Sequence, residues 1–185
     1  MQNNLLETKV VLSPSWRITF DLTPRGYVKN ESSILHGTVD GDVGKMGDRI
    51  PGIWFLPNDT KIKFCHAISG NANSCYKTWI GLKINRTYNI MMQQIVNDFN
   101  GRYYFRIFID RFNIFSVVNT SPEIFKNVKY YSGDPWSQPA KAIVDNFKLV
   151  TFDQGISCSV LFVDFFFLKL LAVVKEEIRK KSFSV

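Results

Sequence analysis

The sequence predicts an all-β protein, and three observations support this fold class. Aromatic residues make up 15% of the chain, and aromatic side chains fit the half-buried pleated surfaces of strands. Segments with alternating polar and apolar residues recur at intervals of roughly 8–15 residues, bounded by turn sequences. No amphipathic helical pattern is evident before residue 155. This combination favours a β-sandwich or barrel over a βαβ fold.

The first half of the chain contains five expected strands. In WRITFDL, residues 16–22, every second residue from Trp16 is apolar and the intervening ones are polar, as a sheet with one wet face requires. SSILHGTV is the second strand, and PGIWFL is a short apolar run typical of a strand covered on both faces. KIKFCHAI and SCYKTW, separated by a Gly-Asn turn, predict a hairpin.

Five further strands are expected in the second half. NRTYNIMMQQIV and RYYFRIFI flank the turn NDFNG, and in the second of them Tyr103, Phe105, Ile107 and Ile109 share a face. IFSVVN, FKNVKYY and AIVDNFKLV follow. Between the last two strands lies YYSGDPWSQPA, residues 130–140, in which glycine and two prolines interrupt the strand pattern.

The formal charge is +7 and the isoelectric point is near 9.3. The basic residues are scattered, and no nucleic-acid-binding motif accompanies them. We therefore expect a solvated basic surface and no nucleic-acid partner. A site for acidic glycans or anionic lipid is the alternative.

Cysteines and glycosylation signals favour an oxidising, secretory compartment. Cys65 and Cys75 bracket a turn and are predicted to form a disulfide, whereas Cys158 stands apart. Asn-x-Ser/Thr acceptor sequences occur at Asn30, Asn58, Asn85 and Asn119. The amino terminus does not resemble a signal peptide. We expect a fragment or an incomplete gene model of an extracellular or cell-surface protein, with a cytosolic protein as the alternative.

The carboxyl-terminal segment departs from the strand pattern. Residues 156–174 are mostly apolar but contain Asp164 and Lys169, and a basic stretch follows. A helix of this length just spans a bilayer core, although each internal charge opposes insertion. Three interpretations stay open: a single membrane span with the sandwich outside, a helix or strand packed on the sandwich, and non-native read-through of a gene model.

Three stretches, residues 32–64, 86–110 and 119–149, carry a family likeness. The first contains Gly-Asp-Arg-Ile-Pro followed by an Ile-Trp-Phe strand, and the third contains the Asp-Pro-Trp loop. Together they resemble the concanavalin A-like lectin/glucanase jelly-roll module of the laminin G-like type, over residues 14–150. The resemblance implies an antiparallel jelly-roll β-sandwich over residues 14–152. Residues 1–13 would be an extension, and residues 153–185 an apolar tail, expected to be helical, with a basic end.

In such a sandwich the chain crosses from one sheet to the other near its end, which explains the interruption at residues 130–140. Pro135 and Pro139 remove backbone donors, and Gly133 permits a bend. Trp136 then caps the core, with its ring buried and its N–H bonded to a carbonyl. A platform on which a sugar ring stacks is the alternative for Trp136, with Asp134 beside it.

Calcium is the one cofactor considered, because clustered carboxylates are candidate ligands for it. Asp134 could bind calcium together with Asp40 and Asp42 of the stretch VDGDVGKMGD, although Asp-Gly-Asp is also an ordinary turn. We expect Asp48 to cap a turn and Arg49 to pair with a carboxylate. His36 and His66 have no second ligand at metal spacing, and neither is expected to bind a metal.

Catalysis is not expected. Glucanases with this fold alternate acidic residues along one strand, and a retaining pair of carboxyl groups lies about 5–5.5 Å apart. Within the predicted sandwich the only glutamates, Glu31 and Glu123, lie in loops, and no serine-hydrolase or phosphate-binding motif occurs. The sequence predicts a non-catalytic extracellular module that binds a glycan or a protein through edge loops. The ectodomain of a membrane-anchored surface protein and an atypical glycan hydrolase are the alternatives.

Overall fold

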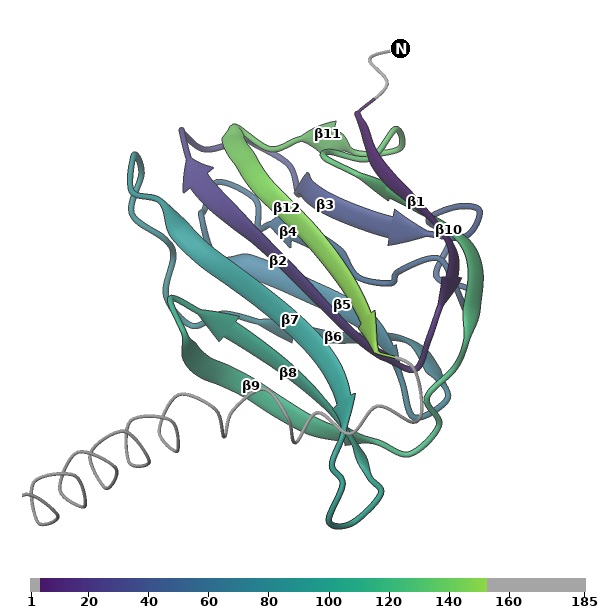
Figure 1. The fold of residues 1–185 in the computed structure, drawn as a ribbon. Helices are drawn as coiled ribbons and strands as arrows, with labels where there is room; N and C mark the ends of the chain where they lie inside the picture. The colour runs from purple at the N-terminus through teal and green to yellow at the C-terminus, as the bar shows by residue number, and fades with distance from the viewer. Residues whose placement is uncertain (1–3, 153–185) are drawn as a thin grey trace, which may run out of the picture. The chain divides into compact units, whose positions relative to one another are not determined.

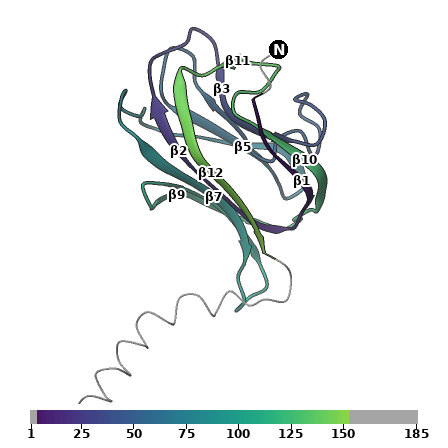
Figure 2. The same cartoon turned by 45° about the horizontal axis from the view of Figure 1, so that its top comes forward.

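Two β-sheets lie face to face in the computed structural model of this protein, which describes residues 4–152 (Figure 1). These residues contain no helix. The two layers are seen from a second direction in Figure 2. The predicted all-β sandwich is therefore confirmed.

The larger sheet has seven strands among the described residues. Six of them follow the order β1-β10-β3-β4-β5-β6, with antiparallel pairing throughout, and the two-residue strand β11 pairs in parallel with β3. Their bounds are β1 Leu5–Leu12, β3 Ser32–Thr38, β4 Gly52–Phe55, β5 Ile62–Ile68, β6 Asn71–Lys77, β10 Phe125–Tyr131 and β11 Gln138–Pro139.

The smaller sheet has five strands in the order β12-β2-β7-β8-β9, and all its pairs are antiparallel. Their bounds are β2 Ser15–Pro24, β7 Tyr88–Val96, β8 Tyr103–Ile109, β9 Phe112–Asn119 and β12 Ala142–Phe152. β2 shows the predicted alternation: Trp16, Ile18, Phe20 and Leu22 are fully buried in the core, and the residues between them are partly exposed.

β1 enlarges the sandwich beyond its predicted start at residue 14. It pairs with β10 over almost its whole length, with Leu12 opposite Phe125 and Lys9 opposite Val128. Leu12 is fully buried. Residues 5–12 therefore belong to the fold and are not an extension of it.

The chain crosses between the sheets where the sequence predicts. β10 lies in the larger sheet and β12 in the smaller one, and residues 132–141 connect them. Gly133 has a φ of 74°, a conformation that favours glycine. Pro139 ends β11. In this connection β11 pairs with the start of β3 (Figure 1), and Trp136 lines a groove together with the loop that follows β3.

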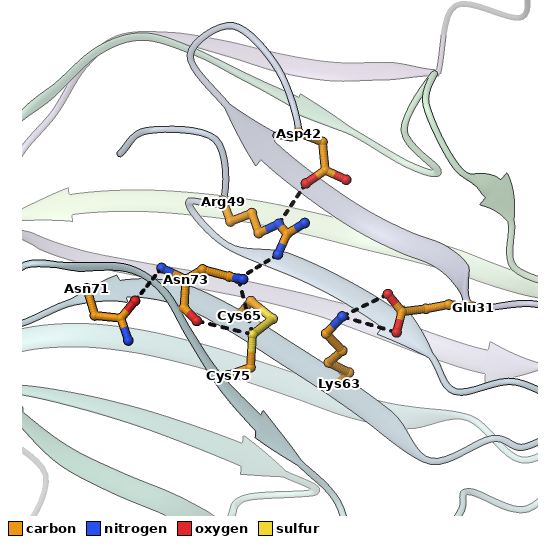
Figure 3. Close-up of a disulfide and its surroundings, with 8 residues drawn as sticks. All are labelled: Glu31, Asp42, Arg49, Lys63, Cys65, Asn71, Asn73 and Cys75. Atoms are coloured by element: carbon orange, nitrogen blue, oxygen red, sulfur yellow. Dashed lines mark hydrogen bonds and ion pairs between the residues drawn. A yellow bond between two sulfur atoms is a disulfide. The ribbon is translucent and has the colours of Figure 1, made fainter. Parts of the chain in front are cut away.

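The predicted disulfide is present. Cys65 on β5 and Cys75 on β6 are directly opposite each other, with their Cα atoms 4.1 Å apart, and their sulfur atoms are bonded (Figure 3). A structural disulfide indicates an oxidising compartment, such as the extracellular space.

Predictions for the carboxyl-terminal segment, residues 153–185, lie outside the described residues and stay predictions. Over residues 4–152, no helix has the length and apolar character needed to cross a membrane.

Candidate functional site

A groove with a volume of about 590 Å³ lies where two loops meet. One wall is the loop between β3 and β4, residues 39–48, and the other is contributed by Trp136 from the β10–β12 connection. We call this space the loop groove. Asp40, Asp42 and Asp48 line it together with three apolar side chains, Val39, Val43 and Met46.

The loop of residues 39–48 is held by two side chains at its ends. The Thr38 hydroxyl accepts the N–H groups of Asp40 and Gly41, and it donates to the carbonyl of Gly41. At the other end, one carboxylate oxygen of Asp48 accepts the N–H groups of Val43 and Lys45, at 2.9 and 2.8 Å. Asp48 thus caps a turn, as predicted, and the loop has a defined shape.

Asp134 organises the opposite wall. Its Oδ1 accepts the backbone N–H groups of Trp136 and Ser137, at 2.9 and 2.6 Å, and its own N–H donates to the Ser33 hydroxyl. This turn orients Trp136, whose side chain meets the edge of the His36 ring at 5.6 Å between centroids. Trp136 is 51% exposed, so its predicted burial as a core cap is wrong.

Below the groove, His36 on β3 contacts Asp134, and both side chains are fully buried. The His36 Nε2 atom donates to the carbonyl of Asp48 at 2.6 Å, and Nδ1 lies 3.2 Å from Asp134 Oδ2. Burial alone would raise the pKa of Asp134, but the neighbouring His36 and Ser33 side chains and the Ser137 N–H hold that pKa well below its usual range. Asp134 is therefore a carboxylate at neutral pH.

Asp42 is paired with Arg49, which confirms the prediction that Arg49 binds a carboxylate. The Arg49 Nε donates to Asp42 Oδ1 at 2.6 Å, and another guanidinium nitrogen donates to Asn73 at 2.5 Å (Figure 3). The guanidinium also lies over the ring of Trp54, 5.1 Å from its centroid. One oxygen of Asp42 lies within 4.8 Å of ligand-type atoms of both His36 and Asp134.

The structure therefore brings together all four residues singled out for ligand or metal binding: Asp40, Asp42, Asp134 and Trp136. Asp40 is exposed on the groove wall. Sequence reasoning missed His36, because the pairing of β10 with β3 that places it beside Asp134 joins distant segments. The only local signal was its position three residues before the loop of residues 39–48.

The glycosylation acceptors do not belong to this site. Asn30, Asn58 and Asn85 are exposed. Asn119 is buried, and its side-chain nitrogen donates to Gln94 Oε1 at 2.6 Å. In the folded chain this burial counts against Asn119 as an acceptor.

Comparison with known proteins finds neither a matching family model nor a matching curated protein. Solved structures do match. A heptameric pentraxin from Limulus polyphemus has a TM-score of 0.51 at 6% identity, covering 78% of this chain and 67% of its own. The receptor-binding domain of botulinum neurotoxin type G has a TM-score of 0.51 at 15% identity, with coverages of 76% and 35%. The fold is a jelly-roll β-sandwich.

A third match is the sialidase of Trypanosoma rangeli, with a TM-score of 0.53 at 13% identity. It covers 73% of this chain but 20% of the sialidase. At sequence identities this low, the structural matches establish the jelly-roll fold but no function. The concanavalin A-like part of the predicted resemblance agrees with this fold, whereas the laminin G-like type stays a prediction.

Proposed function

We propose that this protein is a non-catalytic recognition module that binds a glycan in the loop groove. The observation that carries the proposal is that the half-exposed Trp136 lines the same groove as Asp40 and Asp42. An aromatic face can pack against the apolar face of a sugar ring. Carboxylates at its side accept hydrogen bonds from hydroxyl groups, and a few convergent polar groups of this kind give a pocket its specificity.

The groove is ordered before any ligand binds. Asp134 fixes the turn that carries Trp136, and Asp48 fixes the loop that carries the carboxylates. Ligand binding therefore orders few additional groups, and this lowers its entropic cost. Loops on a rigid sandwich are a common place for binding residues.

An extracellular location is part of the proposal. The Cys65–Cys75 disulfide supports it, because such bonds persist in oxidising compartments. The exposed acceptor sequences at Asn30, Asn58 and Asn85 are compatible with a secreted glycoprotein.

Hydrolysis is the alternative that the carboxylates raise, since Asp42 and Asp134 have oxygen atoms within 4.8 Å of each other. A glycosidase acid requires a raised pKa. The pKa of Asp134 is instead lowered, and Asp42 is paired with Arg49. These two observations favour binding over catalysis.

A protein ligand is the second candidate. Val43 is 76% exposed and Met46 is 38% exposed at the rim of the groove. With Trp136 they form an apolar surface of the kind found at protein interfaces.

A glycan array probed with the full-length chain tests the proposal, once with calcium and once with chelator, since calcium at Asp40 and Asp42 stays a prediction. Trp136→Ala is expected to lower affinity for the bound glycan by at least about tenfold, because a stacked aromatic ring is removed. Trp79→Ala is the matched control, because Trp79 is 87% exposed and does not line the groove.

Absence of any bound glycan, or equal losses in the two variants, would overturn the proposal. A parallel incubation of the array ligands, analysed by mass spectrometry, tests catalysis. Cleavage that Asp42→Asn abolishes would show a hydrolase.

A further inference from the structure

We propose that His36, Asp134 and Asp42 bind a divalent transition-metal ion of the zinc class at the base of the loop groove. Neither glycan binding nor the calcium prediction is needed for this site. His36 has no second ligand at metal spacing in the sequence, and the cluster arises only when β10 pairs beside β3.

The position of the proton on the His36 ring favours a cation between this ring and Asp134. The carbonyl oxygen of Asp48 can only accept a hydrogen bond, so the Nε2 atom 2.6 Å away carries a proton. In a neutral ring, Nδ1 then presents a lone pair. That lone pair faces the Asp134 carboxylate oxygen at 3.2 Å. Two lone pairs at this distance repel each other unless a cation, either a proton or a metal ion, lies between them.

Both facing atoms are buried without a hydrogen-bond partner among the described residues. His36 Nδ1 and Asp134 Oδ2 have neither water access nor an acceptably oriented donor or acceptor. Buried polar atoms are rarely left in this state, because desolvation without a partner costs about 1–3 kcal/mol. A metal ion between them would satisfy both.

The separation of the two facing atoms also fits a zinc ion. Zinc bonds of about 2.0–2.1 Å in a tetrahedron separate neighbouring ligand atoms by about 3.3 Å, and the observed separation of Nδ1 and Oδ2 is 3.2 Å. A histidine that binds a metal commonly donates its other ring N–H to a backbone carbonyl. His36 makes that bond to Asp48.

Asp42 supplies the third ligand from the groove side. Its oxygen lies within 4.8 Å of the other two atoms, so a movement of at most about 1.5 Å would give the ligand spacing of a zinc ion. The carboxylate belongs to a loop, and its side chain is partly exposed. The fourth position would face the groove and be open to water or a ligand oxygen, an arrangement found in zinc sites that keep three protein ligands.

The ligand types select the metal. Imidazole nitrogen suits zinc, cobalt or nickel, whereas calcium takes six or more oxygen ligands. Asp40 is exposed and does not belong to the cluster, so it serves as a control.

The test uses the full-length chain, stripped of metal, in a Cys158→Ser background that removes the third cysteine of the sequence. Zinc titration by calorimetry is expected to show one equivalent, and cobalt is expected to give visible absorption bands of a tetrahedral site. Asp42→Asn should lower zinc affinity at least tenfold, and Asp40→Asn should leave it unchanged. Both substitutions keep the size of the side chain, and neither residue belongs to the hydrophobic core.

His36→Gln should abolish binding, with folding checked by circular dichroism, and the two aspartate variants keep the proposal testable if this variant unfolds. Failure of zinc or cobalt to bind at one equivalent would overturn the proposal. So would equal losses in the Asp42 and Asp40 variants, or nitrogen NMR showing that both ring nitrogens of His36 keep their protons in saturating zinc. The last result would identify a buried imidazolium–carboxylate pair instead.

Discussion

The rings of His66 and Phe105 stack in the core, with centroids 5.0 Å apart and planes inclined by 12°. His66 comes from β5 in one sheet and Phe105 from β8 in the other, so this contact joins the two layers. Trp16 closes one side with its ring centroid 5.1 Å from that of the imidazole. The histidine is thus part of the hydrophobic interior, and its burial has consequences for stability.

Stability should fall in mildly acidic solution because of His66. Burial lowers the pKa of His66 to about 3, against the opposing effect of the Arg49 backbone. Between pH 6.5 and 3 the unfolded chain therefore binds a proton that the folded chain does not. The contribution of neutral His66 to the free energy of unfolding is fully present above pH 6.5. Between pH 7 and pH 5, protonation of this residue in the unfolded chain should lower the free energy of unfolding by about 2 kcal/mol.

Urea unfolding of the wild type and of His66→Phe across this range measures the effect. The variant keeps an aromatic ring and has nothing to titrate at that position, so the free energy of unfolding of the wild type should fall relative to that of the variant by about 2 kcal/mol from pH 7 to pH 5. A constant difference would show that His66 does not titrate as proposed.

Reduction of the disulfide should destabilise the hairpin of β5 and β6. Cys65 and Cys75 are ten residues apart, and closing a loop of this size removes unfolded-state entropy worth about 3 kcal/mol. Urea unfolding with and without dithiothreitol is expected to show a loss of this order. The double variant Cys65→Ala/Cys75→Ala should already have the lower free energy of unfolding, and dithiothreitol should not change it further. A change in this variant would mean that another cysteine is responsible for the effect.

Gly37→Ala should destabilise the floor of the loop groove. A Cβ at this position would lie 2.5 Å from both the Ile50 carbonyl oxygen and the Tyr130 ring, and overpacking of this kind costs about 1–3 kcal/mol. Gly41→Ala is the control, since its nearest neighbour would be 3.9 Å away. Thermal melting of both variants checks the prediction, which equal melting temperatures would contradict.

The Arg49–Asp42 pair should contribute more than an exposed pair. Both side chains are about 85% buried, whereas Arg86 of the Arg86–Asp110 pair is 57% exposed. We expect Arg49→Gln to cost about 2–3 kcal/mol, because it leaves Asp42 without its partner, and Arg86→Gln to cost less than about 1 kcal/mol. Urea unfolding in chelator, which removes any metal contribution, compares the two; similar losses would mean that burial does not strengthen the pair.

The sequence by itself determined the features that a few neighbouring residues encode. Alternation in residues 16–22 set the buried face of β2, and the turn between Cys65 and Cys75 placed the two cysteines opposite each other. Turn-forming residues at Gly133 and Pro139 marked the crossing between the sheets. These signals are local because side-chain period and turn conformation depend on short stretches of backbone.

Only the tertiary structure decided which strands are neighbours. β1 joins the sheet through β10, and β10 lies beside β3, which brings Asp134 to His36 from about a hundred residues away. Hydrophobic burial stabilises any strand pairing that covers the apolar faces, so it does not specify the order of the strands. For the same reason the sequence could not decide that Trp136 remains half exposed in the same groove as Asp42, since that outcome depends on how two distant loops meet.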